Sequence, residues 1–244
     1  MSRLGHYILF LGALFKNPES FKTYVRLTLE ECIYVGINSI VIVSIVSVFM
    51  GAVSTVQTAY NLVSPLIPRS VIGLVVRDLT ILELAPTITA IVFAGKVGSS
   101  IAGNLGTMRI TEQIDALEVM GINSVSYLVL PKILATVFMY PFLVILAGVL
   151  AIGGGYLAAE FAGVLSPADY LGGLQTSFNE FTVTFALIKS VVFGFLISSI
   201  AAFMGFYTRG GALEVGQSST KAVTVSCIAI LLSDFVLAQL LLVQ

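Results

Sequence analysis

Four ionisable side chains lie inside otherwise apolar sequence: Glu83, Lys96, Lys189 and Asp234. A charge within a bilayer is costly, and such residues commonly line a substrate path or pair with one another. Each lysine could meet a charged lipid headgroup or extend its amine to the membrane surface. Glu83 precedes Pro86, which frees a backbone carbonyl in the same helix. Asp234 is better explained as a cap or as a partner for a neighbouring helix than as a substrate contact.

Groupings typical of an enzyme are absent from the sequence. The lone histidine, His6, lies near the amino terminus, and no nucleophile stands out beside a base. The only Gly-Lys pair, Gly95-Lys96, has Ala90 where a phosphate-binding loop needs its first glycine. Cys32 and Cys227 lack the spacing of metal ligands. We therefore expect no catalytic residue, no metal and no cofactor, with any ATP bound by a separate subunit.

The composition is that of an integral membrane protein. Hydrophobic residues make up 57% of the 244 residues and charged residues 10%, against about 45–50% and about 25% in soluble domains. Four uncharged stretches are long enough, or nearly so, to span a bilayer, and 74–106 is a less clean fifth candidate. The four are 32–68, 133–159, 190–208 and 222–233. We predict an all-α membrane protein with five spans. The net charge of −1 and the lack of a basic block exclude nucleic-acid binding.

The first 31 residues differ from the rest because basic and apolar side chains alternate there. Arg3, Lys16, Lys22 and Arg26 are interleaved with large apolar residues, a pattern typical of helices in the membrane interface. No small-residue cleavage pattern follows the short apolar run, so we do not expect a removable signal peptide. The prediction is one domain, 1–244, with an interfacial helical segment at 1–31 and a transmembrane bundle at 32–244.

Loop charges orient the spans. Lysines and arginines gather in the amino-terminal segment, in 96–132 and in 209–221, whereas 160–181 is acidic without any. The positive-inside rule then places the amino terminus in the cytoplasm and the carboxyl terminus outside. Arg69 and Arg77 are exceptions that we assign to lipid headgroups. The first uncharged stretch is interpreted as one long tilted helix that breaks near Ser64-Pro65 and Pro68.

A polar amphipathic segment, 107–121, lies between the second and third predicted spans. Apolar Ile110, Ile114 and Leu117 recur at helical spacing, and Gly121 supplies a stop. Its charged side chains point largely elsewhere: Arg109, Glu112, Asp115 and Glu118. Such a helix between membrane spans is suited to contact a soluble partner. A row of small residues every fourth position just before it, from Ala94 to Gly106, indicates close helix packing within the chain or at a dimer seam.

Two blocks of sequence resemble a known family. LELAPTITAIVFAGKVGSSIAGNLGTMRITEQIDALEVMGI, followed by LVLPK, is similar to the core signature of the MlaE/YrbE permeases. These are membrane subunits of ABC systems that transport phospholipids. The similarity extends through LIKSVVFG and SDFVLAQLL, and so covers most of the chain from about residue 30 onward.

The resemblance implies a homodimer with five spans per subunit after an interfacial helix, in a bacterial inner membrane. Two cytoplasmic ATPase subunits would dock on the coupling helix between spans two and three. A ring of periplasmic MCE-domain (MlaD-like) proteins would lie above, and a STAS-domain accessory protein is a further candidate partner. The implied function is movement of glycerophospholipids between the inner membrane and the MCE-type carrier, which maintains the lipid asymmetry of the outer membrane. The direction of movement stays open.

Site residues follow from matching positions. Lys96 and Lys189 match basic positions that line the central lipid pocket of the family, and Glu83 and Asn104 complete the expected substrate-binding set. The expected ATPase-coupling set is Arg109, Glu112, Asp115, Glu118 and Gly121. Relatives often carry an acid where this chain has Asn104. If that acid pairs with the base matching Lys96, the lysine is here freer to meet an anionic headgroup.

Two other hypotheses remain open at this point. In an ion-coupled secondary carrier of an amphipathic substrate, Glu83, Asp234 and the lysines would relay protons, and transport would need no ATPase. In a membrane scaffold, segment 107–121 would recruit soluble proteins and the lysines would be dispensable.

Overall fold

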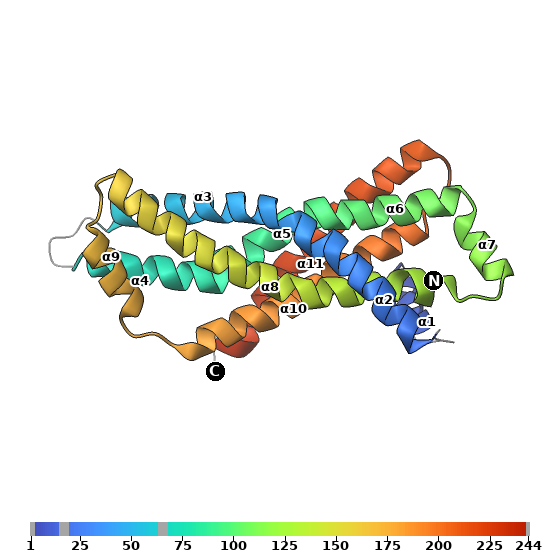
Figure 1. Ribbon diagram of the computed structural model, residues 1–244, viewed down its shortest axis with the longest axis horizontal. Helices are drawn as coiled ribbons and strands as arrows, with labels where there is room; N and C mark the ends of the chain where they lie inside the picture. The colour runs from blue at the N-terminus through green and yellow to red at the C-terminus, as the bar shows by residue number, and fades with distance from the viewer. Residues whose placement is uncertain (1–2, 15–19, 63–67, 243–244) are drawn as a thin grey trace. The chain divides into compact units, whose positions relative to one another are not determined.

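The computed structural model describes residues 3–14, 20–62 and 68–242, and the regular structure in these ranges is entirely helical (Figure 1). The longer helices carry most of the chain. They are α1 (Arg3–Ala13), α2 (Phe21–Cys32), α3 (Asn38–Asn61), α4 (Ser70–Leu79), α6 (Ser99–Ile110), α8 (Ser124–Phe161), α9 (Pro167–Gln175), α10 (Glu180–Phe206) and α11 (Ala212–Leu242). Two short helices are α5 (Thr89–Phe93) and α7 (Gln113–Val119). Three π-helical segments join them: Ile33–Ile37, Thr80–Ile88 and Ala94–Gly98.

The contacts divide the chain into two compact units. Among the described residues, the first unit holds those of 3–39, 90–140 and 191–242, and the second holds those of 40–89 and 141–190. Helices α3, α8 and α10 each contribute residues to both. The single domain 1–244 stays a prediction, and each unit is described below by itself.

The all-α membrane class is confirmed. Four helices are long and apolar enough to cross a bilayer: Phe21–Asn61, Ser124–Phe161, Glu180–Phe206 and Ala212–Leu242. The remaining predicted span lies in the run from Ser70 to Ile110, which is helical throughout, contains two π-helical segments and is not one of these four helices. Pro86 lies in the first of these segments, where its missing N–H interrupts the α-helical hydrogen bonds. The count of five spans stays a prediction.

The predicted boundary between residues 31 and 32 does not coincide with the end of a helix. Helix α2 continues through the π-helical segment Ile33–Ile37 into α3, which makes one helix of 41 residues from Phe21 to Asn61. No proline interrupts this sequence, so nothing forces the interfacial part to separate from the span. The helix ends at Asn61, and the predicted break at Ser64-Pro65 lies outside the described residues.

Helix α1 is a separate element held against α10 in the first unit. The ring of Phe10 is buried and lies 5.5 Å from the Phe203 ring and 5.6 Å from the Phe206 ring. The hydroxyl of Tyr7 shares a 2.7 Å hydrogen bond with that of Ser199. Burial raises the pKa of the Tyr7 phenol, and the hydrogen bond opposes the shift. One face of α1 is therefore fixed to protein.

Glycines allow helices within each unit to touch backbone to backbone. In the second unit, a Cβ on Gly51 would lie 1.8 Å from the carbonyl oxygen of Ala151, and one on Gly154 would lie 2.2 Å from that of Val48. Helices α3 and α8 therefore meet where no side chain fits. In the first unit, Gly106 packs against Val215 of α11, so the small-residue row serves packing within the chain.

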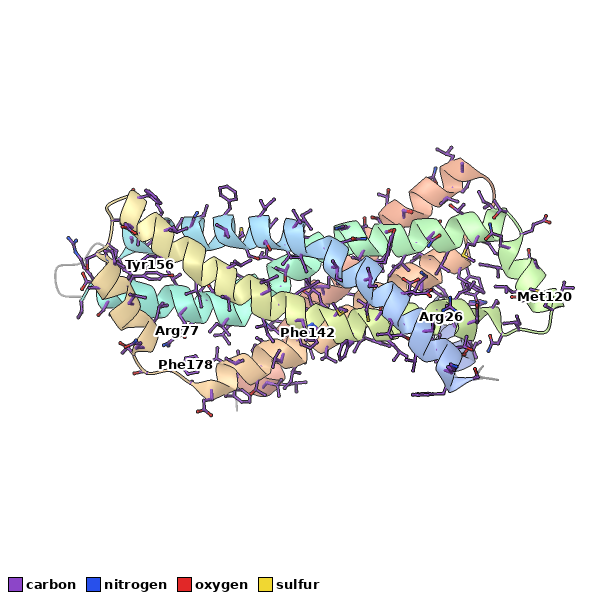
Figure 2. The ribbon with its side chains drawn as sticks, viewed as in Figure 1. Arg26, Arg77, Met120, Phe142, Tyr156 and Phe178 are labelled. Carbon is purple, nitrogen blue, oxygen red and sulfur yellow. The ribbon has the colours of Figure 1, made fainter. Side chains whose placement is uncertain are left out.

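Arg77 of α4 is buried, so its assignment to lipid headgroups is wrong. Its guanidinium group donates hydrogen bonds to the carbonyl oxygens of Leu174 at 2.8 Å and Thr176 at 2.7 Å, and it pairs with Asp78. It also lies 5.4 Å from the centre of the Phe178 ring, and Figure 2 labels both residues. Arginine satisfies several carbonyls at once because its donors form a planar fork. This side chain fixes the end of α9 to α4 within the second unit.

Candidate functional site

Lys189 of α10 and Glu83 form an ion pair in the second unit. The Nζ atom of Lys189 lies 2.9 Å from Oε1 of Glu83 and 2.9 Å from the carbonyl oxygen of Leu82. The ammonium group also lies 4.8 Å from the centre of the Phe185 ring. The second carboxylate oxygen of Glu83 accepts a hydrogen bond of 3.2 Å from the Thr87 hydroxyl. Two of the predicted substrate-binding residues are therefore in direct contact.

The position of Pro86 explains how this pair is built. In an α-helix the carbonyl of Leu82 would accept from the N–H of residue 86, which proline lacks. The ammonium group of Lys189 donates to that same carbonyl. The sequence predicts that the proline frees a backbone carbonyl, and the carbonyl four residues before it is the one that Lys189 contacts.

The two partners differ in exposure. The side chain of Lys189 is 0% exposed, whereas that of Glu83 is 41% exposed. Burying an unpaired ammonium group is costly, and the ion pair with Glu83 offsets that cost for Lys189. The carboxylate, and not the ammonium, is the member of the pair open to the surroundings.

An apolar cavity of about 160 Å³ lies in the same unit. Its walls come from the π-helical segment Thr80–Ile88, α8 and α10. The lining residues are Ile81, Ala85, Val144, Ile145, Gly148, Val149, Ile152, Val183, Ala186 and Leu187. Ile81 and Ala85 flank Glu83 in sequence, and Leu187 lies two residues before Lys189. The walls have the chemistry that a hydrocarbon chain requires.

Lys96 has a different partner, in the first unit. It lies in the π-helical segment Ala94–Gly98, and its ammonium group donates a hydrogen bond to the carbonyl oxygen of Asn38. The side chain is partly exposed. Such π-helical segments often occur at functional sites. The assignment of Lys96 to substrate binding stays a prediction.

Asn104 is exposed on α6 in a groove of about 580 Å³ within the first unit. The groove also contains Glu30 and Glu31, and the nearby hydroxyls of Tyr34 and Ser100 share a 2.7 Å hydrogen bond. Asn104 lies eight positions after Lys96, a rise of about 12 Å at the α-helical spacing. An acid at position 104 would therefore join two existing carboxylates and would not reach Lys96 of the same chain.

The predicted amphipathic helix 107–121 is two pieces in the structure. Helix α6 ends at Ile110, the backbone turns at Glu112 with φ of 60°, and α7 then runs from Gln113 to Val119. Gly121 has φ of 80° and ends the segment, as its sequence position predicts. The helical spacing of apolar residues correctly predicts an inward-facing position for Ile114, which is fully buried. The helix is shorter than predicted because the left-handed turn at Glu112 interrupts it.

Charged side chains of this segment bind it to its neighbours in the first unit. Arg109 at the end of α6 pairs with Asp115 of α7 at 2.7 Å and lies 5.9 Å from the Phe206 ring centre. The carboxylate of Glu118 accepts a hydrogen bond of 2.8 Å from the Ser124 hydroxyl, at the start of α8. Helix α7 is therefore connected by side chains to both α6 and α8.

Two residues at the end of this segment are absent from the predicted coupling set. Val119 is 88% exposed and Met120 is 65% exposed, next to Gly121 (Figure 2). Exposed apolar side chains beside acidic ones are typical of a protein contact surface. The sequence did contain a sign of this surface, because Val119 and Met120 are adjoining apolar residues at the end of an otherwise polar helix.

Sequence reasoning also missed a second buried ion pair. Lys132 of α8 is 5% exposed, and its ammonium group bonds to the carboxylate of Glu31 of α2, both in the first unit. A lysine beside the long apolar run of α8 was the only sequence signal. Within residues 3–14, 20–62 and 68–242 there is no group of three or more metal-ligating side chains of the His, Cys, Asp or Glu type.

Comparisons with known proteins place the sequence in a family. The family described as Permease MlaE matches residues 28–240. A probable ABC transporter permease protein of Rickettsia bellii is 36% identical over 237 residues, which cover 97% of this chain and 91% of that protein. One of Synechocystis is 38% identical, over 88% of this chain and 82% of the relative. The chloroplastic protein TRIGALACTOSYLDIACYLGLYCEROL 1 of Arabidopsis thaliana is 33% identical, over 89% and 62%. This chain, a multi-pass membrane protein, therefore belongs to the MlaE permease family and is the permease subunit of an ABC transporter rather than an enzyme.

Proposed function

We propose that this protein moves glycerophospholipids between a bacterial inner membrane and a periplasmic MCE-domain carrier, and so maintains the lipid asymmetry of the outer membrane. One observation carries the proposal: the ion pair of Lys189 and Glu83 lies on the same helices as an apolar cavity in the second unit. Charged groups beside hydrocarbon-binding walls suit a substrate that is itself amphipathic. The name of the Arabidopsis relative, which contains that of a galactolipid, supports a lipid as cargo.

ATP hydrolysis would take place in a separate cytoplasmic subunit. The acidic and apolar surface of α7, with Glu112, Asp115, Val119 and Met120 exposed, is the proposed docking site for that subunit. In the proposed assembly two copies of this chain form a homodimer with two ATPase subunits below and an MCE-domain ring above. A STAS-domain protein would be an accessory to the ATPase.

Side-chain bonds of α7 suggest how nucleotide-driven movement would reach the membrane. Asp115 is paired with Arg109 of α6, and Glu118 is bonded to Ser124 of α8. Displacement of α7 by the ATPase would therefore move the adjoining ends of both helices. Helix α8 runs without a break from Ser124 to Phe161 and carries several of the residues that line the apolar cavity.

The decisive experiment is reconstitution of the complex in liposomes with a labelled phospholipid and a soluble MCE-domain acceptor. We expect transfer to require ATP and to fall at least tenfold in Asp115→Lys, because the change breaks the bond to Arg109 and reverses a surface charge. Gln113→Lys is the matched control, since Gln113 is exposed on the same helix without an ion pair to lose.

Each alternative gives a different result in this assay. Transport driven by an ion gradient, without nucleotide or ATPase, would instead support the secondary carrier. A complex that recruits the ATPase but moves no lipid under any condition would support the scaffold. Full transport by Asp115→Lys with the ATPase still bound would show that the docking surface lies elsewhere.

A further inference from the structure

Helix α2 has a distinct chemical character within the 41-residue helix Phe21–Asn61. That helix is about 60 Å long at the α-helical rise, whereas the hydrocarbon core of a bilayer is about 30 Å thick. Its charged residues are all in α2: Lys22, Arg26, Glu30 and Glu31. Part of the helix must lie outside the hydrocarbon, and these charges place α2 at the level of the lipid headgroups.

One face of α2 is apolar and open. Phe21, Val25, Leu29 and Ile33 recur at every fourth residue, with exposures of 83%, 41%, 61% and 57%. They line a shallow groove of about 520 Å³ together with Lys22, Arg26 and Glu30. No other part of the described ranges contributes to the lining of this groove. The groove is continuous at Ile33 with the uncharged part of the helix.

The adjoining face of α2 is polar. A pocket of about 450 Å³ lies there, formed by the start of α2 and by Tyr127 of α8. Its lining residues are Ser20, Lys22, Thr23, Arg26, Leu27, Glu30 and Tyr127. The hydroxyls of Ser20 and Thr23 share a hydrogen bond of 2.8 Å, so one hydroxyl proton of the pair is left to donate, and the N–H groups of Phe21 and Lys22 precede the first helical hydrogen bonds.

The charges of this pocket favour an anion. Arg26 pairs with Glu30 at 3.0 Å, so these two largely cancel. Lys22 is exposed and makes no ion pair with any residue in the described ranges, and the charges that line the pocket, Lys22, Arg26 and Glu30, sum to +1. Lys22, Arg26 and Glu30 line both the groove and the pocket, so they form the ridge between the apolar and the polar side (Figure 2 labels Arg26).

We propose that α2 binds a phospholipid molecule across this ridge. The phosphate occupies the polar pocket beside Lys22, and an acyl chain lies along the groove of Phe21, Val25, Leu29 and Ile33. This site uses none of the residues of the proposed transport path and does not depend on it. It anchors the amino-terminal part of the first long helix to one leaflet, which a bound lipid achieves without spanning the membrane.

Charge distinguishes a lipid from a second copy of this chain on the same face. A two-fold contact through this groove would bring together two copies of a patch whose lining charges sum to +1, because such contacts use the same patch on both subunits. A phosphate supplies the opposite charge. The apolar groove and the cationic ridge together match an amphipathic ligand better than a self-contact.

Native mass spectrometry of the full chain in detergent tests the site with two added lipids of equal chain length. Phosphatidylglycerol carries the phosphate and diacylglycerol lacks it. We expect Lys22→Gln to weaken phosphatidylglycerol binding about fivefold, as loss of one basic contact at a membrane surface does, and to leave diacylglycerol binding unchanged. Lys221→Gln, on an exposed lysine of α11, is the matched control and should bind both lipids like the unmodified chain.

A second variant addresses the groove. Val25→Glu places a charge among the apolar side chains and should weaken binding of both lipids. The proposal is overturned if Lys22→Gln and Lys221→Gln retain phosphatidylglycerol equally. It is also overturned if the unmodified chain binds both lipids with the same affinity and Lys22→Gln changes neither. Efficient disulfide cross-linking of two Leu29→Cys chains in the membrane would also overturn it, since it would show a second copy on this face.

Discussion

The ammonium group of Lys189 donates to both the carboxylate of Glu83 and the carbonyl oxygen of Leu82, each at 2.9 Å. Pro86 has no N–H to donate to Leu82 in the α-helical pattern, and Lys189 donates to the Leu82 carbonyl within a π-helical segment. The ammonium group of Lys189, the carboxylate of Glu83 and the π-helical segment around Pro86 thus form one local arrangement. Its stability depends on the lysine having both acceptors.

Glu83→Gln should destabilise the protein more than Lys189→Met. Removal of the carboxylate leaves a fully buried ammonium, whereas removal of the lysine leaves a carboxylate that is 41% exposed and still bonded to Thr87. Breaking a buried pair costs roughly 3–5 kcal/mol, and we expect about 1–3 kcal/mol for Glu83→Gln because that residue is partly exposed. Thermal unfolding of the detergent-purified protein measures the difference.

The double variant Glu83→Gln/Lys189→Met provides the control for this asymmetry. It should be more stable than Glu83→Gln alone, because no unpaired buried charge remains. The predicted coupling between Glu83 and Lys189 would be contradicted if the two single variants lost equal stability and the double variant lost the sum of the two losses.

Arg77→Gln should loosen the end of α9 in the second unit. The change removes two hydrogen bonds from a charged donor to the carbonyls of Leu174 and Thr176, and we expect a loss of about 2–4 kcal/mol. Hydrogen exchange should rise most in residues 174–178. Arg69→Gln removes the same charge from an exposed arginine at the start of α4 and should leave exchange there unaltered. Equal exchange in the two variants would show that Arg77 does not hold the end of α9.

Composition and periodicity are sufficient to predict the membrane class, the long apolar helices and the amphipathic character around Ile114. These properties depend on neighbours in the sequence. The proline effect at Pro86 was also predictable, because a missing N–H acts within one helical turn.

Contacts between distant residues were not predictable in the same way. Arg77 looks like a headgroup ligand in sequence because its acceptors are backbone carbonyls 97 and 99 residues later, which no residue pattern marks. Lys189 and Glu83 are 106 residues apart, so the sequence shows two unusual charges without showing that they pair. The turn at Glu112 depends on a left-handed backbone that non-glycine residues adopt only in a particular tertiary setting.

Tyr7 should make the docking of α1 sensitive to alkaline pH. Burial raises the pKa of its phenol above the ordinary value near 10, so folding favours the protonated form. The associated stability is complete below about pH 10 and is lost as the pH rises through the folded-state pKa. Tyr7→Phe removes this alkaline loss together with the bond to Ser199. Melting temperatures from about pH 8 to about pH 11 measure it. Phe10→Leu, which weakens the same contact without removing the phenol, should lower stability at every pH and keep the alkaline slope.

Adjacent glycines of α8 give a sharp test of the close contact with α3. A methyl group on Gly154 would lie 2.2 Å from the carbonyl oxygen of Val48, whereas one on Gly153 would have no atom of another described helix within 4 Å. Gly154→Ala should therefore destabilise the protein by about 1–3 kcal/mol, the usual cost of overpacking, since a backbone atom cannot move aside cheaply. Gly153→Ala should be neutral or stabilising by up to about 1 kcal/mol, because alanine favours the helix. Thermal unfolding of both variants in one detergent measures the contrast, and equal stabilities would show that α3 and α8 do not touch at Gly154.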